Sequence, residues 1–266
     1  MSALKALIFD VDGTLADTER NGHLPAFNKA FSEAGLPWHW SVELYGKLLA
    51  VTGGKERIRH YIENYQANFL APGDLGEFIA DLHRAKNAFY AEMVAAGEIP
   101  LRPGVRRLLL EAQAEGIRLA IATTTSMENV EALLEHSLEP DAVSWFEVIA
   151  AGDTVAAKKP APDIYHYTLE AMDLSAEECL AIEDSANGLR SALAAGIKTV
   201  VTVSDYTRNE RFVGAALVVD HLGEPDQPLK VLAGDDHGET LIDIAVLRRV
   251  YDDDGANEAA PARTAP

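Results

Sequence analysis

Short apolar runs alternate with amphipathic helical patterns over most of the chain. Five runs are too short for buried helices and are typical of buried strands: Leu4–Phe9, Leu119–Ala122, Val148–Ala150, Leu180–Ile182 and Thr199–Val203. Between them, apolar residues recur every three or four positions, as in one face of a helix, over Val105–Glu115, Ser126–Leu138, Pro162–Met172 and Ser185–Ala195. This alternation predicts an α/β fold with a doubly wound, Rossmann-like parallel sheet.

The segment 16–96 interrupts this alternation. Its apolar residues fall at helical spacing in Ala26–Ala34, Lys55–Tyr65 and Leu75–Met93, and none of its runs resembles a strand. We therefore predict a core domain of residues 1–15 and 97–235, with a small all-helical domain, 16–96, inserted after the first strand. Residues 236–266 are expected to form a C-terminal helix and a disordered acidic tail, because the last residues include few bulky apolar side chains.

Composition narrows the class of protein. The 266 residues include 23 basic and 42 acidic side chains, a formal net charge of −19, which disfavours binding to nucleic acid or to anionic membranes. Cys179 is the single cysteine, so an intrachain disulfide and a cysteine-based zinc site are excluded. Apolar runs stay far below the roughly 18 residues of a membrane span, and the N-terminus lacks a signal-peptide pattern. We expect a cytoplasmic monomer.

Carboxylates follow two of the predicted strands, at the edge where parallel sheets bind their ligands. Asp10 and Asp12 end the first strand, and residues two apart in an extended chain point to the same side. Glu183 and Asp184 end another strand and add more oxygen ligands. Oxygen ligands without His or Cys favour Mg²⁺ over zinc, and a carboxylate can also act as a nucleophile towards phosphate.

Groups that suit phosphate follow the other strands. Thr123 and Thr124 offer hydroxyls, and Lys158 or Lys159 offers an amine. Each motif has an ordinary structural explanation as well: a Lys-Pro turn, β-branched strand residues, or an N-cap before a helix. Their conjunction at successive strand ends favours a phosphoryl-transfer site.

Four motifs in this order make the chain resemble the haloacid dehalogenase (HAD) superfamily of phosphotransferases; they are Asp10-Val-Asp12-Gly-Thr, Thr123, Lys159-Pro-Ala-Pro-Asp163 and Glu183-Asp184. The resemblance implies that Asp10 is the nucleophile and Asp12 the general acid and base. It further implies that Thr123 and Lys159 bind the transferred phosphate. Mg²⁺ would be held by Asp10, by Asp184 and by the backbone carbonyl of Asp12, with Glu183 as a further contributor to the metal site. The motif selects Lys159 over Lys158.

Two clusters in the helical insertion narrow the resemblance: Thr52-Gly53-Gly54-Lys55-Glu56-Arg57, and His83-Arg84-Ala85-Lys86. Glycines before a helix allow a close approach by an anion, although both clusters also fit a solvated helix surface. With Asp17 and His23 at the start of the insertion, they resemble the CbbY family, which accompanies Rubisco in autotrophs that use the Calvin cycle. The insertion itself resembles the small cap of the β-phosphoglucomutase-like branch.

The CbbY resemblance implies a Mg²⁺-dependent phosphatase that acts on a sugar bisphosphate through an aspartyl-phosphate. The first candidate substrate is xylulose-1,5-bisphosphate, which would be converted to xylulose 5-phosphate. Lys55, Arg57, Arg84 and Lys86 would hold the distal phosphate, and Asp17 and His23 the sugar hydroxyls. The full set implied for substrate binding is Asp17, His23, Thr52, Gly53, Gly54, Lys55, Arg57, His83, Arg84, Lys86, Thr124, Thr125 and Ser126.

Four other activities compete with this interpretation. A β-phosphoglucomutase-like mutase shares all the core motifs, so the motifs leave it open. Asp12 disfavours a haloacid dehalogenase, which does not need that carboxylate. A phosphonatase needs a lysine in an apolar setting for its Schiff base, and the sequence does not exclude Lys55 or Lys86, although neither has an obvious apolar setting. A non-catalytic binding protein would be expected to lack Asp10 or Asp184, and both are present.

The net charge does not oppose an anionic substrate. Residues 44–90 contain six basic and five acidic side chains, a net charge of +1, so the remaining −20 lies elsewhere in the chain. Because salt screens a distant surface field, a metal ion and a few well-placed cations determine whether phosphate binds.

Overall fold

The computed structural model describes residues 3–51, 53–152, 154–235 and 237–253. Within this part, the chain forms two compact units. The first unit takes in the residues up to 17 together with those from 100 onward, and the second unit takes in residues 18–99. The chain thus enters and leaves the second unit through the segments around positions 17 and 100.

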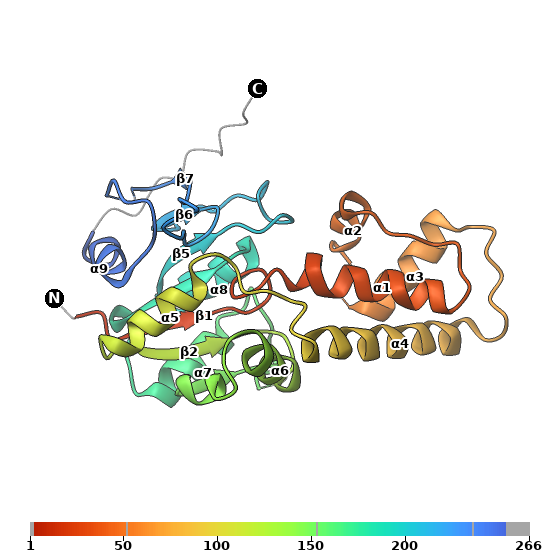
Figure 1. Ribbon diagram of the computed structural model, residues 1–266, viewed down its shortest axis with the longest axis horizontal. Coiled ribbons are helices and arrows are strands. Elements are labelled where there is room, and N and C mark those ends of the chain that lie inside the picture. Colours follow the sequence, from red (N-terminus) through yellow and green to blue (C-terminus); the bar gives the residue numbers. More distant parts are fainter. Residues whose placement is uncertain (1–2, 52, 153, 236, 254–266) are drawn as a thin grey trace, which may run out of the picture. The chain divides into compact units, whose positions relative to one another are not determined.

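A seven-stranded sheet in the order β3-β2-β1-β4-β5-β6-β7 is the centre of the first unit (Figure 1). The strands are β1 (Ala6–Phe9), β2 (Arg118–Ala122), β3 (Val148–Ala150), β4 (Cys179–Glu183), β5 (Lys198–Thr202), β6 (Leu217–Val219) and β7 (Val231–Ala233). All neighbours are parallel except β6 and β7. The predicted α/β class with a parallel sheet is confirmed, and β6 and β7 are additional strands that the apolar pattern did not predict.

Helices flank the sheet of the first unit, with α5 and α7 on opposite sides of β2 (Figure 1). They are α5 (Val105–Ala114), α6 (Met127–Ser137), α7 (Asp163–Met172), α8 (Ala186–Ala194) and α9 (Ile244–Asp252), with 3₁₀ turns at Ala142–Trp145 and Ala176–Glu178. On one sheet face, the apolar stripe of α7 packs against the small residues of β1 and β2. Because each stripe recurs at helical spacing, α5 to α8 lie where the periodicity predicts them.

Every secondary-structure element assigned to the described residues of the second unit is a helix. A π-helical turn, η1 (Glu19–His23), precedes α1 (Leu24–Glu33), α2 (Val42–Leu48), α3 (Gly54–Tyr65) and α4 (Leu75–Ala95). Aromatic side chains of Phe27, Phe31 and Trp40 form its buried centre. The predicted helical segment after β1 is confirmed, whereas α2, seven residues long, is too short for its period to stand out. In the described part of the chain, no helix is both long and apolar enough to cross a membrane.

Candidate active site

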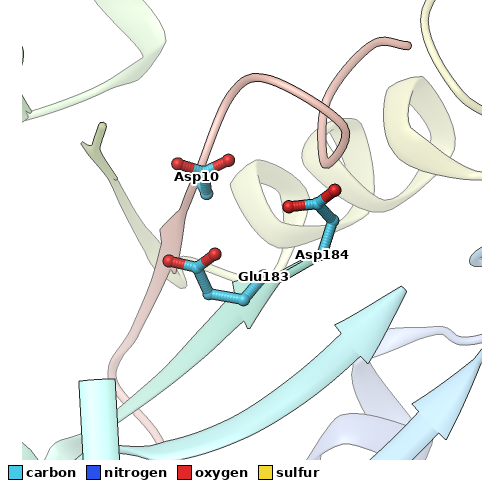
Figure 2. Close-up of side chains that lie close together, drawn as sticks. All are labelled: Asp10, Glu183 and Asp184. Atoms are coloured by element: carbon cyan, nitrogen blue, oxygen red, sulfur yellow. The ribbon is translucent and has the colours of Figure 1, made fainter. Parts of the chain in front are cut away.

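Three buried carboxylates meet at the carboxyl edge of the sheet (Figure 2). Asp10 directly follows β1, Glu183 ends β4, and Asp184 comes next. β1 and β4 are adjacent parallel strands in which Phe9 pairs with Ile182, so their ends are level. One carboxylate oxygen from each residue lies within 4.8 Å of the others. The sheet therefore brings together acidic residues that are far apart in the sequence.

Lys159 connects two of these carboxylates. Its Nζ donates to Asp10 Oδ1 at 2.7 Å, to Glu183 Oε1 at 2.6 Å and to the Ala122 carbonyl at 2.7 Å. Burial alone would lower the pKa of Lys159, but Asp10 and Glu183 together raise it above its ordinary value. Lys158, the other candidate in the sequence, is exposed and donates to the Gly152 carbonyl. The ammonium at the site is thus the one from Lys159.

Glu183 is held from two directions and has one oxygen left over. Besides Lys159, the hydroxyl of Tyr165 donates to its Oε1 at 2.5 Å. Its Oε2 is buried and has no hydrogen-bond partner. A Cβ at Gly188 would lie 1.8 Å from this Oε2, so only glycine fits beside it. A buried carboxylate oxygen without a donor is costly, so this oxygen is suited to a cation as its partner.

The electrostatics of the cluster fit a divalent cation. Burial, Asp10 and Glu183 raise the pKa of Asp184 well above its ordinary value. Three carboxylates face one directly bonded ammonium, that of Lys159, which leaves a formal excess of two negative charges. Carboxylate oxygens are the ligands that Mg²⁺ takes in proteins. The residues present therefore suit a Mg²⁺ ion.

The loop after β1 brings the chain close to this cluster. Gly13 has φ +86°, and a Cβ on it would lie 2.2 Å from Asp184 Oδ2, so this position requires glycine. Its amide donates to the Ala16 carbonyl at 2.8 Å, which closes the loop. Asp12, inside the loop, is half-buried, and its carboxylate is not part of the cluster that Asp10, Glu183 and Asp184 form among the described residues.

The side chains of the hydroxyl-rich segment after β2, residues 123–126, have different surroundings. Thr123 is buried, and its Oγ1 accepts from the amide of Thr125 at 3.3 Å. Thr124 is exposed and Thr125 half-buried. The hydroxyl of Ser126 accepts from the Asn129 amide at 3.4 Å and caps α6. Thr123 thus lies at the strand end next to the cluster, whereas Ser126 starts a helix.

The second unit contains a cluster of basic side chains of its own. Lys86 Nζ lies 2.9 Å from His23 Nδ1 and over the rings of Phe27 and Tyr90, at 5.2 and 5.0 Å from their centroids. Lys86 is buried. Burial lowers the pKa of His23 well below its ordinary value, and the positive charges of Lys86 and Arg57 lower it further. His23 is therefore neutral at neutral pH beside a buried ammonium.

Arg57 belongs to the same surroundings and is held rigidly. Its Nε donates to the Leu48 carbonyl and its Nη1 to the Tyr45 hydroxyl, both at 3.2 Å. Tyr45 in turn donates to Glu19 Oε2 at 2.5 Å. The guanidinium is thus oriented by α2 and η1 rather than free to move. Sequence reasoning missed Tyr45 and Glu19, because they stand in different segments from the basic motif.

The remaining residues of the two basic motifs lie on different helix faces, some half-buried and some exposed. His83 is half-buried, and a Cβ at Gly54 would lie 2.4 Å from its Nε2. Gly53 has φ +95°, and Lys55 is exposed. Arg84 is exposed and forms an ion pair with Asp81. Position 84 falls on the outer face of α4 while 86 falls on the inner face, so Arg84 does not join Lys86. Thr52 lies outside the described residues.

Asp17 pairs with a residue that sequence reasoning missed. Its Oδ1 lies 3.3 Å from Nε of Arg102, and both residues belong to the first unit. In the sequence, nothing in Leu101-Arg-Pro-Gly marks its arginine as buried. Tyr165 was missed for a similar reason: it lies on the apolar stripe of α7, where an aromatic residue is ordinarily part of the core.

Comparison with known proteins relates the chain to one family of hydrolases. The sequence profile described as haloacid dehalogenase-like hydrolase matches residues 4–196. The plasmid-encoded protein CbbY of Cupriavidus necator is 52% identical over 226 residues, which are 85% of this chain and 89% of the relative. A CBBY-like protein of Arabidopsis thaliana is 40% identical over 84% of this chain and 70% of its own length.

Solved structures agree with the sequence comparison. The D10N variant of CbbY from Rhodobacter sphaeroides, in complex with xylulose-1,5-bisphosphate, is 47% identical with a TM-score of 0.69. The similarity covers 82% of this chain and 94% of that one. A CbbY structure from the same organism in complex with phosphate has the same TM-score and coverage. The fold and nearly half of the aligned residues are thus shared with these proteins.

Proposed function

The chain belongs to the haloacid dehalogenase-like hydrolases and, among them, to the CbbY family, and on this premise we propose that it removes one phosphate from a sugar bisphosphate. The first candidate substrate is xylulose-1,5-bisphosphate, which would give xylulose 5-phosphate and inorganic phosphate. The observation that carries the proposal is the buried group of Asp10, Glu183 and Asp184 around the ammonium of Lys159. It combines a nucleophile, a cation site and a phosphate-binding cation in one place.

The first half of the reaction transfers the phosphoryl group to the protein. A carboxylate oxygen of Asp10 attacks phosphorus, and the bond between phosphorus and the sugar oxygen breaks. Asp12 protonates the leaving oxygen, so the sugar departs as an alcohol. Lys159 stays protonated because of its two carboxylate partners and can neutralise charge on the transferred phosphate. Thr123, at the end of β2, supplies a further donor to the same phosphate.

The second half releases the phosphate. Asp12, now a carboxylate, takes a proton from a water molecule that attacks phosphorus, and the bond between phosphorus and Asp10 breaks. Mg²⁺ would be held by Asp10, by Asp184 and by the backbone carbonyl of Asp12, with Glu183 beside them. When bound, this ion offsets the negative charge of the transferred phosphoryl group.

The second unit supplies the recognition of the second phosphate. Lys86, Arg57 and the neutral His23 form a largely buried group, in which burial first and the cations second depress the pKa of the histidine. An anion placed there would offset the positive charges of Lys86 and Arg57 and gain charge-assisted hydrogen bonds. The CbbY of Rhodobacter sphaeroides in complex with xylulose-1,5-bisphosphate supports a ligand with two phosphates for this family.

A phosphate-release panel tests the proposal. The purified protein with MgCl₂ is assayed on xylulose-1,5-bisphosphate, ribulose-1,5-bisphosphate, β-glucose-1-phosphate and phosphoglycolate. We expect the highest kcat/KM for xylulose-1,5-bisphosphate, with one phosphate released per sugar. A higher kcat/KM for phosphoglycolate would refute the substrate assignment. Formation of glucose-6-phosphate from β-glucose-1-phosphate, without net phosphate release, would identify a mutase instead.

A further inference from the structure

One buried arginine gathers the backbone around the nucleophile loop. Arg102 follows the segment that returns from the second unit, and its side chain is 6% exposed. Its Nη1 donates to the Gly13 carbonyl, to the Thr202 carbonyl at 2.8 Å and to Thr202 Oγ1 at 2.9 Å. Its Nη2 donates to the carbonyls of Val203 at 2.6 Å and Asp220 at 2.7 Å. The guanidinium thus joins the nucleophile loop to the ends of β5 and β6.

Within the first unit, the same residue also contacts the chain segment that leads into the second unit. Arg102 Nε lies 3.3 Å from Asp17 Oδ1, and Asp17 is the last residue of the first unit before the chain enters the second. The amide of Arg102 donates to the Leu15 carbonyl at 2.8 Å, and Leu101 forms a β-bridge with Ala16. The outgoing and returning segments are therefore paired at this residue.

The peptide that Arg102 holds is the one that touches the acidic cluster. Gly13 follows Asp12 directly and packs against the carboxylate of Asp184 so closely that a Cβ would lie 2.2 Å from Oδ2. A shift of the Gly13 peptide would therefore move Asp12 and Asp184 relative to Asp10. We infer that Arg102 is a positioning residue for the phosphatase reaction, which sets the loop of Asp12 and orients the carboxylate of Asp17 towards the sugar. The part about Asp17 rests on the proposed function.

The number of acceptors explains why this position needs arginine. A guanidinium presents five N–H donors in a fixed plane, whereas an ammonium offers three on a flexible stem. Lysine would keep the positive charge near Asp17 but could not hold the carbonyls of the nucleophile loop, β5 and β6 together. R102K therefore separates positioning from charge.

The chain contains a matched control for a purely structural arginine. Arg107, five residues further on, donates through Nη2 to the carbonyls of Leu222, Gly223 and Ile242 at 2.9–3.2 Å. Its ion pairs are with Glu111 on its own helix and with Glu224. These contacts join α5 to the C-terminal part of the first unit, away from the nucleophile loop. R107K should lower stability without moving the site.

The test compares R102K and R107K on an aryl phosphate and on xylulose-1,5-bisphosphate, with Tm measured for each. We expect R102K to lower kcat on the aryl phosphate by about 10–100-fold, because small misplacements of reacting groups have effects of this size, with KM nearly unchanged. R107K should keep kcat within about twofold at a similar loss of Tm. Equal kcat values for both variants and the wild type would show that Arg102 is merely structural.

If R102K does not fold, T202V provides a second variant, because it removes one acceptor of the guanidinium. A several-fold lower kcat of T202V supports the inference, and an unchanged kcat contradicts it.

A double-mutant cycle tests the part that concerns Asp17. On xylulose-1,5-bisphosphate, D17N should lower kcat/KM less in the R102K background than in the wild type, because the lysine keeps a positive charge near Asp17 but no longer fixes the direction of its carboxylate. Additive losses would refute the coupling.

If the wild type hydrolyses the aryl phosphate but not xylulose-1,5-bisphosphate, the proposed substrate fails. The cycle is then run on the sugar phosphate that the panel identifies, and the aryl phosphate comparison of R102K with R107K still decides the positioning role.

Discussion

Two buried lysines, one in each unit, have opposite surroundings. In the first unit, Lys159 lies between the carboxylates of Asp10 and Glu183, which raise its pKa despite burial. In the second unit, Lys86 lies against His23 and two aromatic rings, and it helps to depress the pKa of that histidine. The first lysine is part of an acidic group, and the second is part of a basic one.

The difference assigns different ligands to the two units. Crowded carboxylates around Lys159 favour a divalent cation and, with it, the phosphate on which chemistry occurs. Crowded cations around Lys86 favour an anion that takes no part in bond breaking. In our proposal, the first unit therefore performs the reaction and the second selects the substrate. Single substitutions can separate the two roles, and their expected effects range from complete loss of activity to a small change in stability.

Replacing the nucleophile should remove activity on every substrate. D10N keeps the size of the side chain but removes the attacking carboxylate, so phosphate release should fall by on the order of a thousandfold or more. EDTA should abolish the wild-type activity, and added MgCl₂ should restore it. Colorimetric phosphate release on an aryl phosphate and on xylulose-1,5-bisphosphate measures both. Activity of D10N above a tenth of the wild type would refute the aspartyl-phosphate mechanism.

Removing the lysine of the second unit should affect only the bisphosphate. K86M should lower kcat/KM on xylulose-1,5-bisphosphate by about 30-fold or more, because losing one partner of a buried charged contact costs about 2–5 kcal/mol. Turnover of the aryl phosphate should stay within about twofold. R84M is the matched control, since Arg84 is exposed on the same helix, and it should leave both activities unchanged. Equal losses of K86M on the two substrates would remove Lys86 from substrate recognition.

A single methyl group tests how tightly the acidic cluster is packed. In G188A, the new Cβ would meet Glu183 Oε2 at 1.8 Å, so the carboxylate must shift away from Lys159 or Asp10. We expect a loss of about 1–3 kcal/mol in the free energy of unfolding and a several-fold lower kcat on both substrates. G73A serves as the control, since a Cβ there has no neighbour within 4 Å. Wild-type kcat in G188A would contradict the close packing of this cluster.

The depressed pKa of His23 predicts a small effect of pH on stability. Below about pH 6.5 the unfolded chain binds a proton that the folded protein refuses, owing to burial and the charges of Lys86, Arg57 and His83. The contribution of His23 to stability is therefore complete above this pH and is lost as the pH falls. Relative to H23Q, the wild type should lose at most about 1.4 kcal/mol per pH unit between pH 6.5 and 5.5.

Urea unfolding at several pH values measures this slope. H166Q, which changes an exposed histidine of α7, should run parallel to the wild type. Parallel curves for the wild type and H23Q as well would show that His23 is not shielded from protonation by its neighbours.

The pattern of apolar and polar residues was enough to predict the α/β fold of this protein and the residues of its acidic cluster. Strand ends follow from short apolar runs, and helix faces follow from a period of 3.6, so the sequence alone places Asp10, Glu183 and Asp184 at one sheet edge. The helical insertion could be inferred in the same way. β6 and β7 could not, because no helix lies between β5 and β6 in the described chain and two of the three residues of β7 are exposed, so neither strand fits the alternation of buried runs and helices.

Only the tertiary structure decided which side chains meet. Arg84 and Lys86 are nearly equivalent in the sequence, yet one faces solvent and the other is buried beside His23, because helix rotation separates them and α1 covers one face. Arg102 and Tyr165 acquire their roles from acceptors that lie many residues away, on β5, on β4 and directly after β6. A side chain's partners are set by how strands and helices pack in three dimensions, and no period along one segment contains that information.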